Sequence, residues 1–317
     1  MRAIAIALTV LFGLGGGAAQ AAFPGSNGRI AFAMETWQRP DPCVPVAHGC
    51  EPELVSSRIE TVLPSGRGRR VLYDLPAGLA SESGPAWSPN GRLLALQRQG
   101  RLEILRRDGT VVRRLPQFTD WDAEPAWSPD GRRLAFAGGG PNWLFTVRSD
   151  GTARRRVVAQ AAAAPTWSIT DRIAFAHYRD QYAKPVSARD GLYAISPNGT
   201  RLRRLYGRRL GTGGQPDWSP DGSRIAFQAG GQIFTLRADG RGLRQLTAFK
   251  HDRVLAGPVW SPDGRYMAFT RVYDLYVMRA SGRGLRRVVD APSLTDVDQL
   301  DRPWSQLSAP AWQPLPR

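Results

Sequence analysis

The stretch Pro125-Ala126-Trp127-Ser128-Pro129-Asp130-Gly131-Arg132, followed by Arg-Leu-Ala-Phe, recurs in close copies along the chain. Its tryptophan appears six times, with spacings of 40, 40, 51, 42 and 52 residues. The six are Trp87, Trp127, Trp167, Trp218, Trp260 and Trp312. A repeat of roughly 40 to 50 residues is typical of a solenoid or a propeller. The 317 residues are therefore expected to form an array of one structural unit.

Each copy contains a second turn about twenty residues after the first, as at Asp108-Gly109 and Asp150-Gly151. Proline presets one position of such a turn and glycine adopts the left-handed position, while the runs between the turns are short and rich in β-formers. Four strands of about six residues fill a unit of this length. We therefore expect each unit to be a four-stranded antiparallel sheet, with strands A to D in chain order and the tryptophan on strand A.

The two ends of the chain are complementary halves of one unit. Pro310-Ala311-Trp312 supplies a strand A near the C-terminus, and Asn27-Gly28-Arg29-Ile30-Ala31-Phe32 supplies the segment that should follow it. A ring needs its ends to meet, whereas a solenoid needs caps. The sequence therefore predicts an all-β fold, a six-bladed β-propeller of four-stranded antiparallel blades, closed by N- and C-terminal strands that share one blade.

The recurrent Pro-x-Trp-Ser-Pro-Asp-Gly unit resembles the WD-repeat-like β-propeller repeat of the TolB family, which also occurs in the propeller domains of prolyl oligopeptidase-type enzymes. The resemblance covers nearly all of the chain after residue 21. It implies a propeller and, by analogy, a role in an envelope complex with a peptidoglycan-associated lipoprotein. The sequence departs from the TolB pattern because no small α/β domain precedes the first blade, and from the peptidases because only five residues follow Trp312.

The N-terminal segment predicts export. Residues 1–21 combine Arg2, an apolar run from Ala3 to Leu14 and an Ala19-Gln20-Ala21 cleavage site, which is the pattern of a secretory signal peptide. The propeller then occupies residues 22–317. No later run is long enough to span a bilayer, so we expect no transmembrane segment and a periplasmic or extracellular location. In an oxidising compartment, Cys43 and Cys50 are expected to form a disulfide.

The composition excludes some classes of protein. With 42% hydrophobic and 9% aromatic residues, the chain is not intrinsically disordered. The formal charge of +16 suggests nucleic acid at first. However, the basic residues other than Lys184 and Lys250 are arginines, and they recur beside the Asp-Gly turns of every repeat. A nucleic-acid site gathers its charge on one surface, so we expect solvated charge around the propeller, no nucleic-acid partner, and an attraction to anionic wall polymers or membrane surfaces.

Strand parity separates the two ends of the propeller. The A–B and C–D connections share one end, which we call the turn face, while the B–C and D–A connections share the other, which we call the loop face. The turns are short and uniform, whereas the loops vary in length and carry the reactive side chains, and variable loops on a rigid scaffold are where binding usually resides. The candidate partner-binding residues are Asp120, Trp121, Asp122, Glu124, Trp143, His177, Tyr178, Arg179, Tyr182, His251, Asp252, Arg253 and Trp304.

Each candidate has a structural alternative. Asp120, Asp122 and Glu124 offer oxygen ligands for a cation, but they lack the glycine and the distal glutamate of a calcium loop, so a solvated acidic loop is the expected state. The loop that begins at His177 could bind an anion or a sugar, or merely pack on its neighbour. Cys43, His48 and Cys50 fit a disulfide better than a metal site. The repeated tryptophans are expected to be buried between blades.

The chain has no nucleophile elbow, zinc-protease motif, P-loop or dinucleotide fingerprint. We therefore expect no catalytic residue, no metal and no cofactor. The favoured function is an exported, non-catalytic and monomeric propeller that binds a protein or an envelope polysaccharide through its loop face. The alternative is a carbohydrate-active hydrolase or lyase that uses loop-borne acids such as Asp122 and Glu124.

Overall fold

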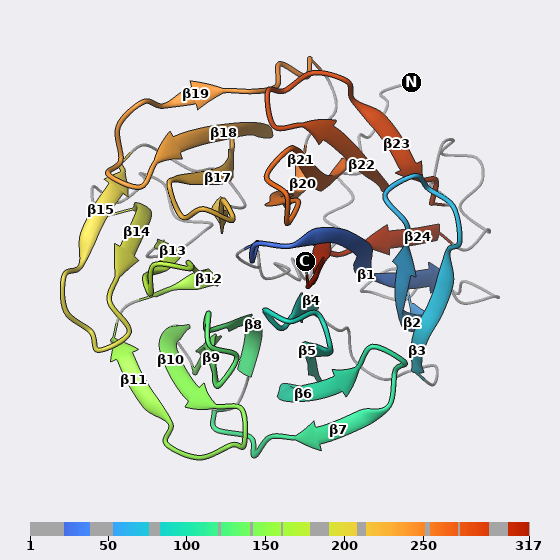
Figure 1. The fold of residues 1–317 in the computed structure, drawn as a ribbon. Helices are drawn as coiled ribbons and strands as arrows, with labels where there is room; N and C mark the ends of the chain where they lie inside the picture. The colour runs from blue at the N-terminus through green and yellow to red at the C-terminus, as the bar shows by residue number, and fades with distance from the viewer. Residues whose placement is uncertain are drawn as a thin grey trace, which may run out of the picture.

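The computed structural model describes residues 22–38, 53–75, 83–119, 122–139, 142–159, 161–177, 190–207, 214–250, 254–271, 273–291 and 304–316. These residues form 25 strands and no helix, and the strands are arranged as six antiparallel blades around a central axis (Figure 1). The predicted all-β, six-bladed propeller is confirmed.

Blades 1 to 5 follow one another along the chain, each with four strands in the order A to D from the axis outward (Figure 1). Blade 1 contains β4 (Ser83–Trp87), β5 (Leu93–Arg98), β6 (Arg101–Arg106) and β7 (Val111–Arg114). Blade 2 contains β8 (Asp122–Trp127), β9 (Arg133–Gly138), β10 (Trp143–Arg148) and β11 (Arg155–Val158). Blade 3 contains β12 (Ala163–Trp167), β13 (Ile173–His177), β14 (Gly191–Ile195) and β15 (Arg203–Tyr206). Blade 4 contains β16 (Gly214–Trp218), β17 (Arg224–Ala229), β18 (Gln232–Arg237) and β19 (Arg244–Gln245). Blade 5 contains β20 (Val254–Trp260), β21 (Tyr266–Arg271), β22 (Asp274–Arg279) and β23 (Arg286–Val289).

Blade 6 is built from both ends of the chain, as predicted. It contains β1 (Ser26–Gln38), β2 (Glu53–Val62), β3 (Arg70–Leu75), β24 (Trp304–Leu307) and β25 (Ala311–Leu315). Both C-terminal strands pair with β1, β25 from Ser26 to Ala31 and β24 from Met34 to Trp37. The strand A position of this blade is therefore occupied by two strands in line. The strands also extend into two stretches expected to be loops, since β1 reaches Gln38 and β24 lies within residues 290–308.

The repeat tryptophans are buried between blades, as predicted. Trp127 of blade 2 packs in one core cluster with Ala86 and Leu102 of blade 1, and its Nε1 donates a hydrogen bond of 2.9 Å to the Ala86 carbonyl. Trp218 packs in the same way against Leu192 of blade 3. Each tryptophan thus covers the preceding blade, and the core is a ring of interfaces rather than one central mass.

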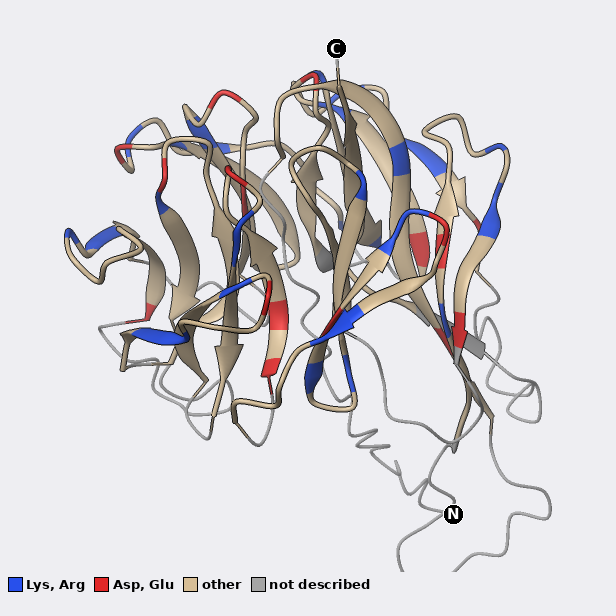
Figure 2. Ribbon diagram, turned by 60° about the horizontal axis from the view of Figure 1, so that its bottom comes forward, with Lys and Arg blue, Asp and Glu red and all other residues tan. Residues whose placement is uncertain are grey.

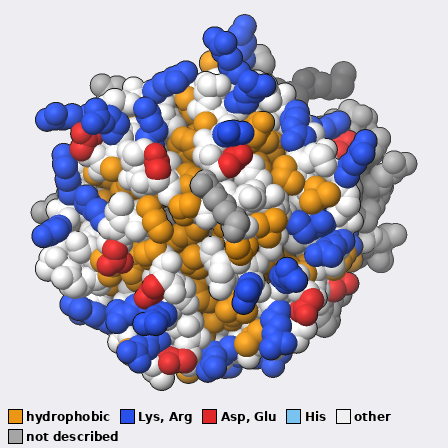
Figure 3. Space-filling model, viewed as in Figure 1, with side chains coloured by type: hydrophobic (Ala, Val, Ile, Leu, Met, Phe, Trp, Pro, Cys, Tyr) orange, Lys and Arg blue, Asp and Glu red, His pale blue; other side chains and the backbone are white. Residues whose placement is uncertain are grey.

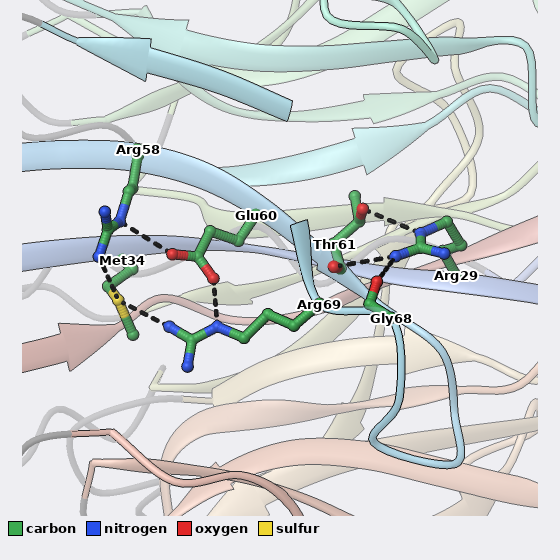
Figure 4. A network of polar contacts seen from close by, with 7 residues as sticks. All are labelled: Arg29, Met34, Arg58, Glu60, Thr61, Gly68 and Arg69. Atoms are coloured by element: carbon green, nitrogen blue, oxygen red, sulfur yellow. Dashed lines mark hydrogen bonds and ion pairs between the residues drawn. The ribbon is translucent and has the colours of Figure 1, made fainter. Parts of the chain in front are cut away.

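The middle of each blade holds either an aromatic stack between strands B and C or a buried glutamate on strand C. In blades 2 to 5, a phenylalanine on strand B stacks on an aromatic ring of strand C, with ring centroids 5.4 to 6.0 Å apart. The pairs are Phe136–Phe145, Phe175–Tyr193, Phe227–Phe234 and Phe269–Tyr276. In blades 6 and 1 the strand C position holds a buried glutamate. Glu60 is held by Arg58 and Arg69 (Figure 4), and Glu103 accepts a hydrogen bond of 2.9 Å from Arg114. A charged contact here replaces an aromatic stack.

The outer rim of the turn face joins neighbouring blades through arginine side chains. The arginine four residues after the turn glycine donates to a backbone carbonyl in the next blade's C–D turn. The five observed contacts are Arg113 to Asp150, Arg155 to Asn198, Arg203 to Asp239, Arg244 to Ser281 and Arg286 to Pro64. Lys and Arg side chains consequently encircle this face, while hydrophobic side chains lie nearer its centre (Figure 3). The positive charge rings the propeller as predicted, but these five arginines are bound to backbone and not simply solvated.

The same rim explains the turn glycines. Gly109 has φ of 91°, a conformation that L side chains rarely adopt. A Cβ at this position would lie 1.9 Å from the carbonyl oxygen of Leu72 in the preceding blade. The repeated Asp-Gly dipeptide therefore serves both the turn and the contact between blades.

Residues 22–25 cross the centre of the turn face. The Ala22 N–H donates to the Trp218 carbonyl of blade 4, and the Gly25 N–H donates to the Pro262 carbonyl of blade 5, both at 3.3 Å. Phe23 is 2% exposed and packs in a cluster with Ala86 and Trp127. Since these contacts reach blades on different sides of the axis, the segment joins them in addition to the closure by β25.

Candidate functional site

Four sequence candidates have described side chains, namely Asp122, Glu124, Trp143 and His177, and all four lie at the loop-face ends of strands in blades 2 and 3. Trp304 lies at the start of β24, although its side chain is not described. The other candidates lie outside the described residues: Asp120, Trp121, Tyr178, Arg179, Tyr182, His251, Asp252 and Arg253, together with Cys43 and Cys50. Figure 2 shows the blades from the side, with the C-terminal end of the chain at the turn face.

Asp122 is fully buried and closes the loop that leads into its own strand. Its carboxylate accepts hydrogen bonds from the Phe118 N–H at 2.7 Å and from the Thr119 hydroxyl at 2.6 Å. Burial raises the pKa of this carboxyl above its ordinary value, while the hydrogen bonds from Thr119 and Phe118 oppose the shift. The expected solvated acidic loop is therefore wrong here, because β8 begins at Asp122 and draws the side chain inside.

Glu124 forms a contact between blades 2 and 3. Its Oε2 accepts a hydrogen bond of 2.6 Å from the N–H of Ala164. Both residues precede a proline of the repeat and have positive φ, 56° and 49°. Burial raises the pKa of Glu124 to about 7, and the hydrogen bond from Ala164 acts in the opposite direction. The solvated loop is wrong for this residue as well.

The same contact recurs two blades further on with a neutral side chain. Gln215 also precedes a repeat proline, and its Oε1 accepts a hydrogen bond from the N–H of Gly257 in blade 5. Two residues further on, Asp217 is fully buried and accepts a hydrogen bond of 2.6 Å from the Trp260 N–H. Burial raises the pKa of Asp217 well above its ordinary value. Acidic and amide side chains thus perform one task on the inner strands, which is to join neighbouring blades.

Trp143 begins β10 and is half-buried. The guanidinium of Arg156 lies 4.7 Å from the centre of its indole ring, and Phe145 lies beside it at 6.5 Å. A cation over an aromatic face is an attractive arrangement that also fixes the orientation of the ring. Of the four described candidates, Trp143 is the one that combines an aromatic surface with partial exposure.

His177 ends β13 and is 7% exposed. Its Nδ1 lies 2.5 Å from the carbonyl oxygen of Ala161, and its ring meets the ring of Tyr193 edge-on, with centroids 5.7 Å apart. The histidine therefore packs on its neighbours, which is the structural alternative considered for this loop.

The structure brings part of the predicted site together. Asp122 and Trp143 flank Gly138, since both pair with it in the register of blade 2. Glu124 links this blade to blade 3, where His177 ends strand B. Among the described residues, no three His, Cys, Asp or Glu side chains form a group that could hold a metal ion. The described parts of the loop face therefore offer an aromatic surface above a structural layer of acids.

A pocket of about 680 Å³ opens at the turn face between blades 2 and 3, where no site was expected. Its basic residues include Arg133, Arg172 and Arg201. A signal for it exists in the sequence, because the third copy of the repeat reads Trp167-Ser168-Ile169-Thr170-Asp171 and lacks the Pro-Asn-Gly or Pro-Asp-Gly of the first, second, fourth and fifth copies. The remaining turns are uniform, so the sequence pattern favoured the more variable loop face.

Comparison with solved structures identifies the type of propeller. TolB from Acinetobacter baumannii superposes with a TM-score of 0.65 at 16% identity, covering 93% of this chain and 68% of that chain. A putative TolB from Agrobacterium tumefaciens gives a TM-score of 0.61 at 20% identity, covering 89% and 99%. The chain has a TolB-like propeller fold. This TolB-like propeller matches no family model and no curated protein.

The fold is also shared with an enzyme. A gluconolactonase from Xanthomonas campestris gives a TM-score of 0.54 at 20% identity, covering 79% of this chain and 88% of that chain. At such identities the likeness concerns the fold alone. In the part of the TolB-like propeller that the structure describes, no helix is long and apolar enough to cross a membrane.

Proposed function

We propose that the TolB-like propeller is an exported, non-catalytic scaffold that binds a protein or an envelope polymer through its loop face. One observation carries the choice of binding over catalysis. Glu124, the strongest candidate for a catalytic acid, makes the same inter-blade hydrogen bond as Gln215, which cannot exchange a proton. A task that an amide performs equally well is a structural task.

The surroundings of Asp122 support the same choice. A general acid or base must lie within hydrogen-bond reach of the substrate. Both oxygens of Asp122 accept hydrogen bonds from its own loop, and the side chain is fully buried. Asp122 and Glu124 thus act as structural residues of the inner strands.

Aromatic and arginine side chains support binding of a macromolecule. Trp143 with Arg156 over its ring offers a pre-oriented surface, and Arg271 lies 4.3 Å from the ring centre of Phe249 near the D–A connection of blade 4. Arginine and large aromatic residues are enriched at the centres of protein interfaces. The sequence adds Trp121 and Tyr182 as further aromatic candidates.

Export and the class of partner rest on the sequence and on the neighbours. The predicted signal peptide at residues 1–21 supports export of the mature chain, which we propose to be a monomer with a Cys43–Cys50 disulfide. Two of the similar structures are TolB proteins, and an envelope partner is consistent with that likeness. The excess of arginine favours a partner that is anionic.

The binding test compares loop-face and turn-face variants of the purified mature protein. Envelope fractions are cross-linked to wild type, to a Trp121→Ala/Tyr182→Ala double variant, and to an Arg283→Gln variant on the turn face as control. We expect the double variant to lose the captured partner and the control to retain it. Equal capture by all three proteins would contradict a loop-face site.

A second candidate function is hydrolysis, favoured by the gluconolactonase neighbour and by the raised pKa of Glu124. It is tested by assaying the purified protein on sugar lactones, glycans and peptides, with and without divalent metals. Turnover that Glu124→Gln abolishes, while the variant keeps its fold, would replace the binding proposal by an enzymatic one.

A further inference from the structure

The pocket between blades 2 and 3 concentrates positive charge. Arg133 and Arg155 line it from blade 2, and Arg172, Arg201 and Arg203 line it from blade 3. Asp171 is the acidic residue of the lining. Its Oδ1 accepts a hydrogen bond of 2.8 Å from the Trp167 indole. Among the described residues, no carboxylate lies within 4.0 Å of any of the five guanidinium groups as an ion pair.

The pocket coincides with a departure from the repeat at the A–B turn of blade 3. In blade 2 the Ser128 N–H donates to the Arg133 carbonyl, whereas in blade 3 the Ser168 N–H donates to the Arg172 carbonyl, so the turn is one residue shorter. Asp171 has φ of 57° where Gly131 has 69°. Aspartate is one of the few residues other than glycine that adopt this left-handed conformation readily, so it can take the place of the turn glycine. The shortened turn supplies Arg172 to the pocket.

A second departure lies at the C–D turn of the same blade. Arg201 has φ of 57° at a position that is Gly242 in blade 4 and Gly284 in blade 5, with φ of 66° and 67°. Glycine is the residue that this conformation favours. Blade 2 has Ala153 at this position, with φ of 52°, so a side chain is tolerated here, and in blade 3 that side chain is an arginine that lines the pocket. Two residues with positive φ, from different turns of blade 3, border one cavity.

The arginines are only partly satisfied by the protein. Two of them make rim contacts. Arg155 donates a hydrogen bond of 2.8 Å to the Asn198 carbonyl, and Arg203 donates one of 2.8 Å to the Asp239 carbonyl. The Nε of Arg172 is buried and has no hydrogen-bond partner among the described residues. Burial lowers the pKa of Arg172 from its ordinary value, and the charges of Arg203 and Arg201 add to the shift. An anion in the pocket would relieve the repulsion among these guanidinium groups.

We propose that this pocket is a binding site for a phosphate ester of a small sugar. Guanidinium groups present planar donor forks that match the oxygens of phosphate, and several of them around one cavity favour a dianion over a single carboxylate. A volume of about 680 Å³ exceeds the space that a bare phosphate needs and lies within the range of small-molecule sites. Hydroxyl groups of Thr170, Ser196 and Thr200 in the lining offer partners for a sugar.

The pocket lies at the turn face and is separate from the loop face. The proposal for the pocket therefore does not depend on the proposed function. The sugar phosphate could be a free metabolite or a phosphorylated unit of an envelope polymer. Both share the chemistry that the pocket recognises, so the test includes one probe of each kind.

The test measures the affinity of the purified mature protein for glucose 6-phosphate and for poly(glycerol phosphate) by calorimetry at low salt, with glucose as the neutral control. The variants are Arg172→Gln and Arg201→Gly. The second restores the glycine of the repeat, so it should fold at least as well as wild type. Arg283→Gln removes one charge from the turn face of blade 5 and is the matched control.

We expect binding of glucose 6-phosphate but not of glucose. Loss of one charged hydrogen-bond donor should weaken binding about tenfold in Arg172→Gln and in Arg201→Gly, against less than about twofold in Arg283→Gln. Binding of the polymer with the same variant pattern would identify the polymer-borne source. Equal weakening by Arg283→Gln would mean attraction to the whole rim and would overturn the proposal, as would absence of binding to either phosphate probe.

Discussion

Arg113 of blade 1 donates a hydrogen bond of 3.1 Å from its Nη1 to the backbone carbonyl of Asp150 in the C–D turn of blade 2. Four further arginines at the equivalent repeat position make the same contact with the following blade. A propeller is held together by the contacts between its blades, because each blade is a small sheet that cannot bury its faces alone. Part of the charge of +16 is therefore a component of the fold.

These rim contacts predict a modest and additive effect on stability. Arg113→Gln should lower the free energy of unfolding by about 0.5 to 1 kcal/mol, since the hydrogen bond is exposed to solvent. Arg113→Gln combined with Arg244→Gln should lose about twice as much, because the two contacts lie in different interfaces. Urea denaturation measures the effect, with exposed Arg107→Gln in the blade 1 turn as control. An equal loss in the control would indicate a general effect of charge.

The architecture could be predicted from the sequence because the same turn and strand pattern occurs six times. The repeated tryptophan, as at Trp127, predicted burial between blades, and the repeated glycine, as at Gly109, predicted the turns. The complementary ends of the chain predicted the closure of the ring. The contacts between blades could not be predicted from the sequence, since Glu124 and Ala164 are 40 residues apart and belong to different sheets. The sequence alone therefore predicted that the acidic residues before the repeat proline, such as Glu124, lie in a solvated loop. Similarly, nothing in the local sequence shows that Arg172 and Arg201 border one cavity, because they belong to different turns of blade 3.

The inner strands predict a distinct effect at Asp217. Its Oδ2 accepts a hydrogen bond of 2.6 Å from the Trp260 N–H. Asp217→Ala would leave this buried donor without its partner and should lower the free energy of unfolding by about 1 to 3 kcal/mol. Asp217→Asn keeps an acceptor and carries no buried charge, so at pH 8 it should be at least as stable as wild type. Thermal and urea unfolding of the three proteins measure the order; a destabilised Asn variant would contradict the assigned role.

The N-terminal crossing of the turn face predicts that Phe23 stabilises the closed ring. Phe23→Ala removes a side chain that is 2% exposed and packs with Ala86 and Trp127 of two blades. By analogy with other buried phenylalanines, the loss should be about 3 kcal/mol. The neighbouring Pro24 is exposed and supplies the control Pro24→Ala. Equal melting temperatures for the two variants would show that residues 22–25 contribute nothing to the ring.

Glu124 predicts a pH dependence of stability with a defined sign. Its pKa rises from 4.5 in the unfolded chain to about 7 in the folded protein. Below pH 4.5 the carboxyl is protonated in both states and has no effect. As the pH rises towards 7, the unfolded state releases its proton first, so stability falls, and above pH 7 the loss is complete. A shift of this size corresponds to roughly 3 kcal/mol.

The variant Glu124→Gln isolates this effect, because Gln215 demonstrates that an amide can make the same inter-blade hydrogen bond. Wild type and variant should have similar free energies of unfolding near pH 4.5, and the variant should be the more stable by about 2 to 3 kcal/mol at pH 8. Other buried acids, such as Asp122 and Asp217, contribute equally to both proteins and cancel in the difference. If the two curves run parallel from pH 4.5 to pH 8, the carboxyl is not held in the dry inter-blade contact with Ala164, and the structural role that favours binding over catalysis is lost.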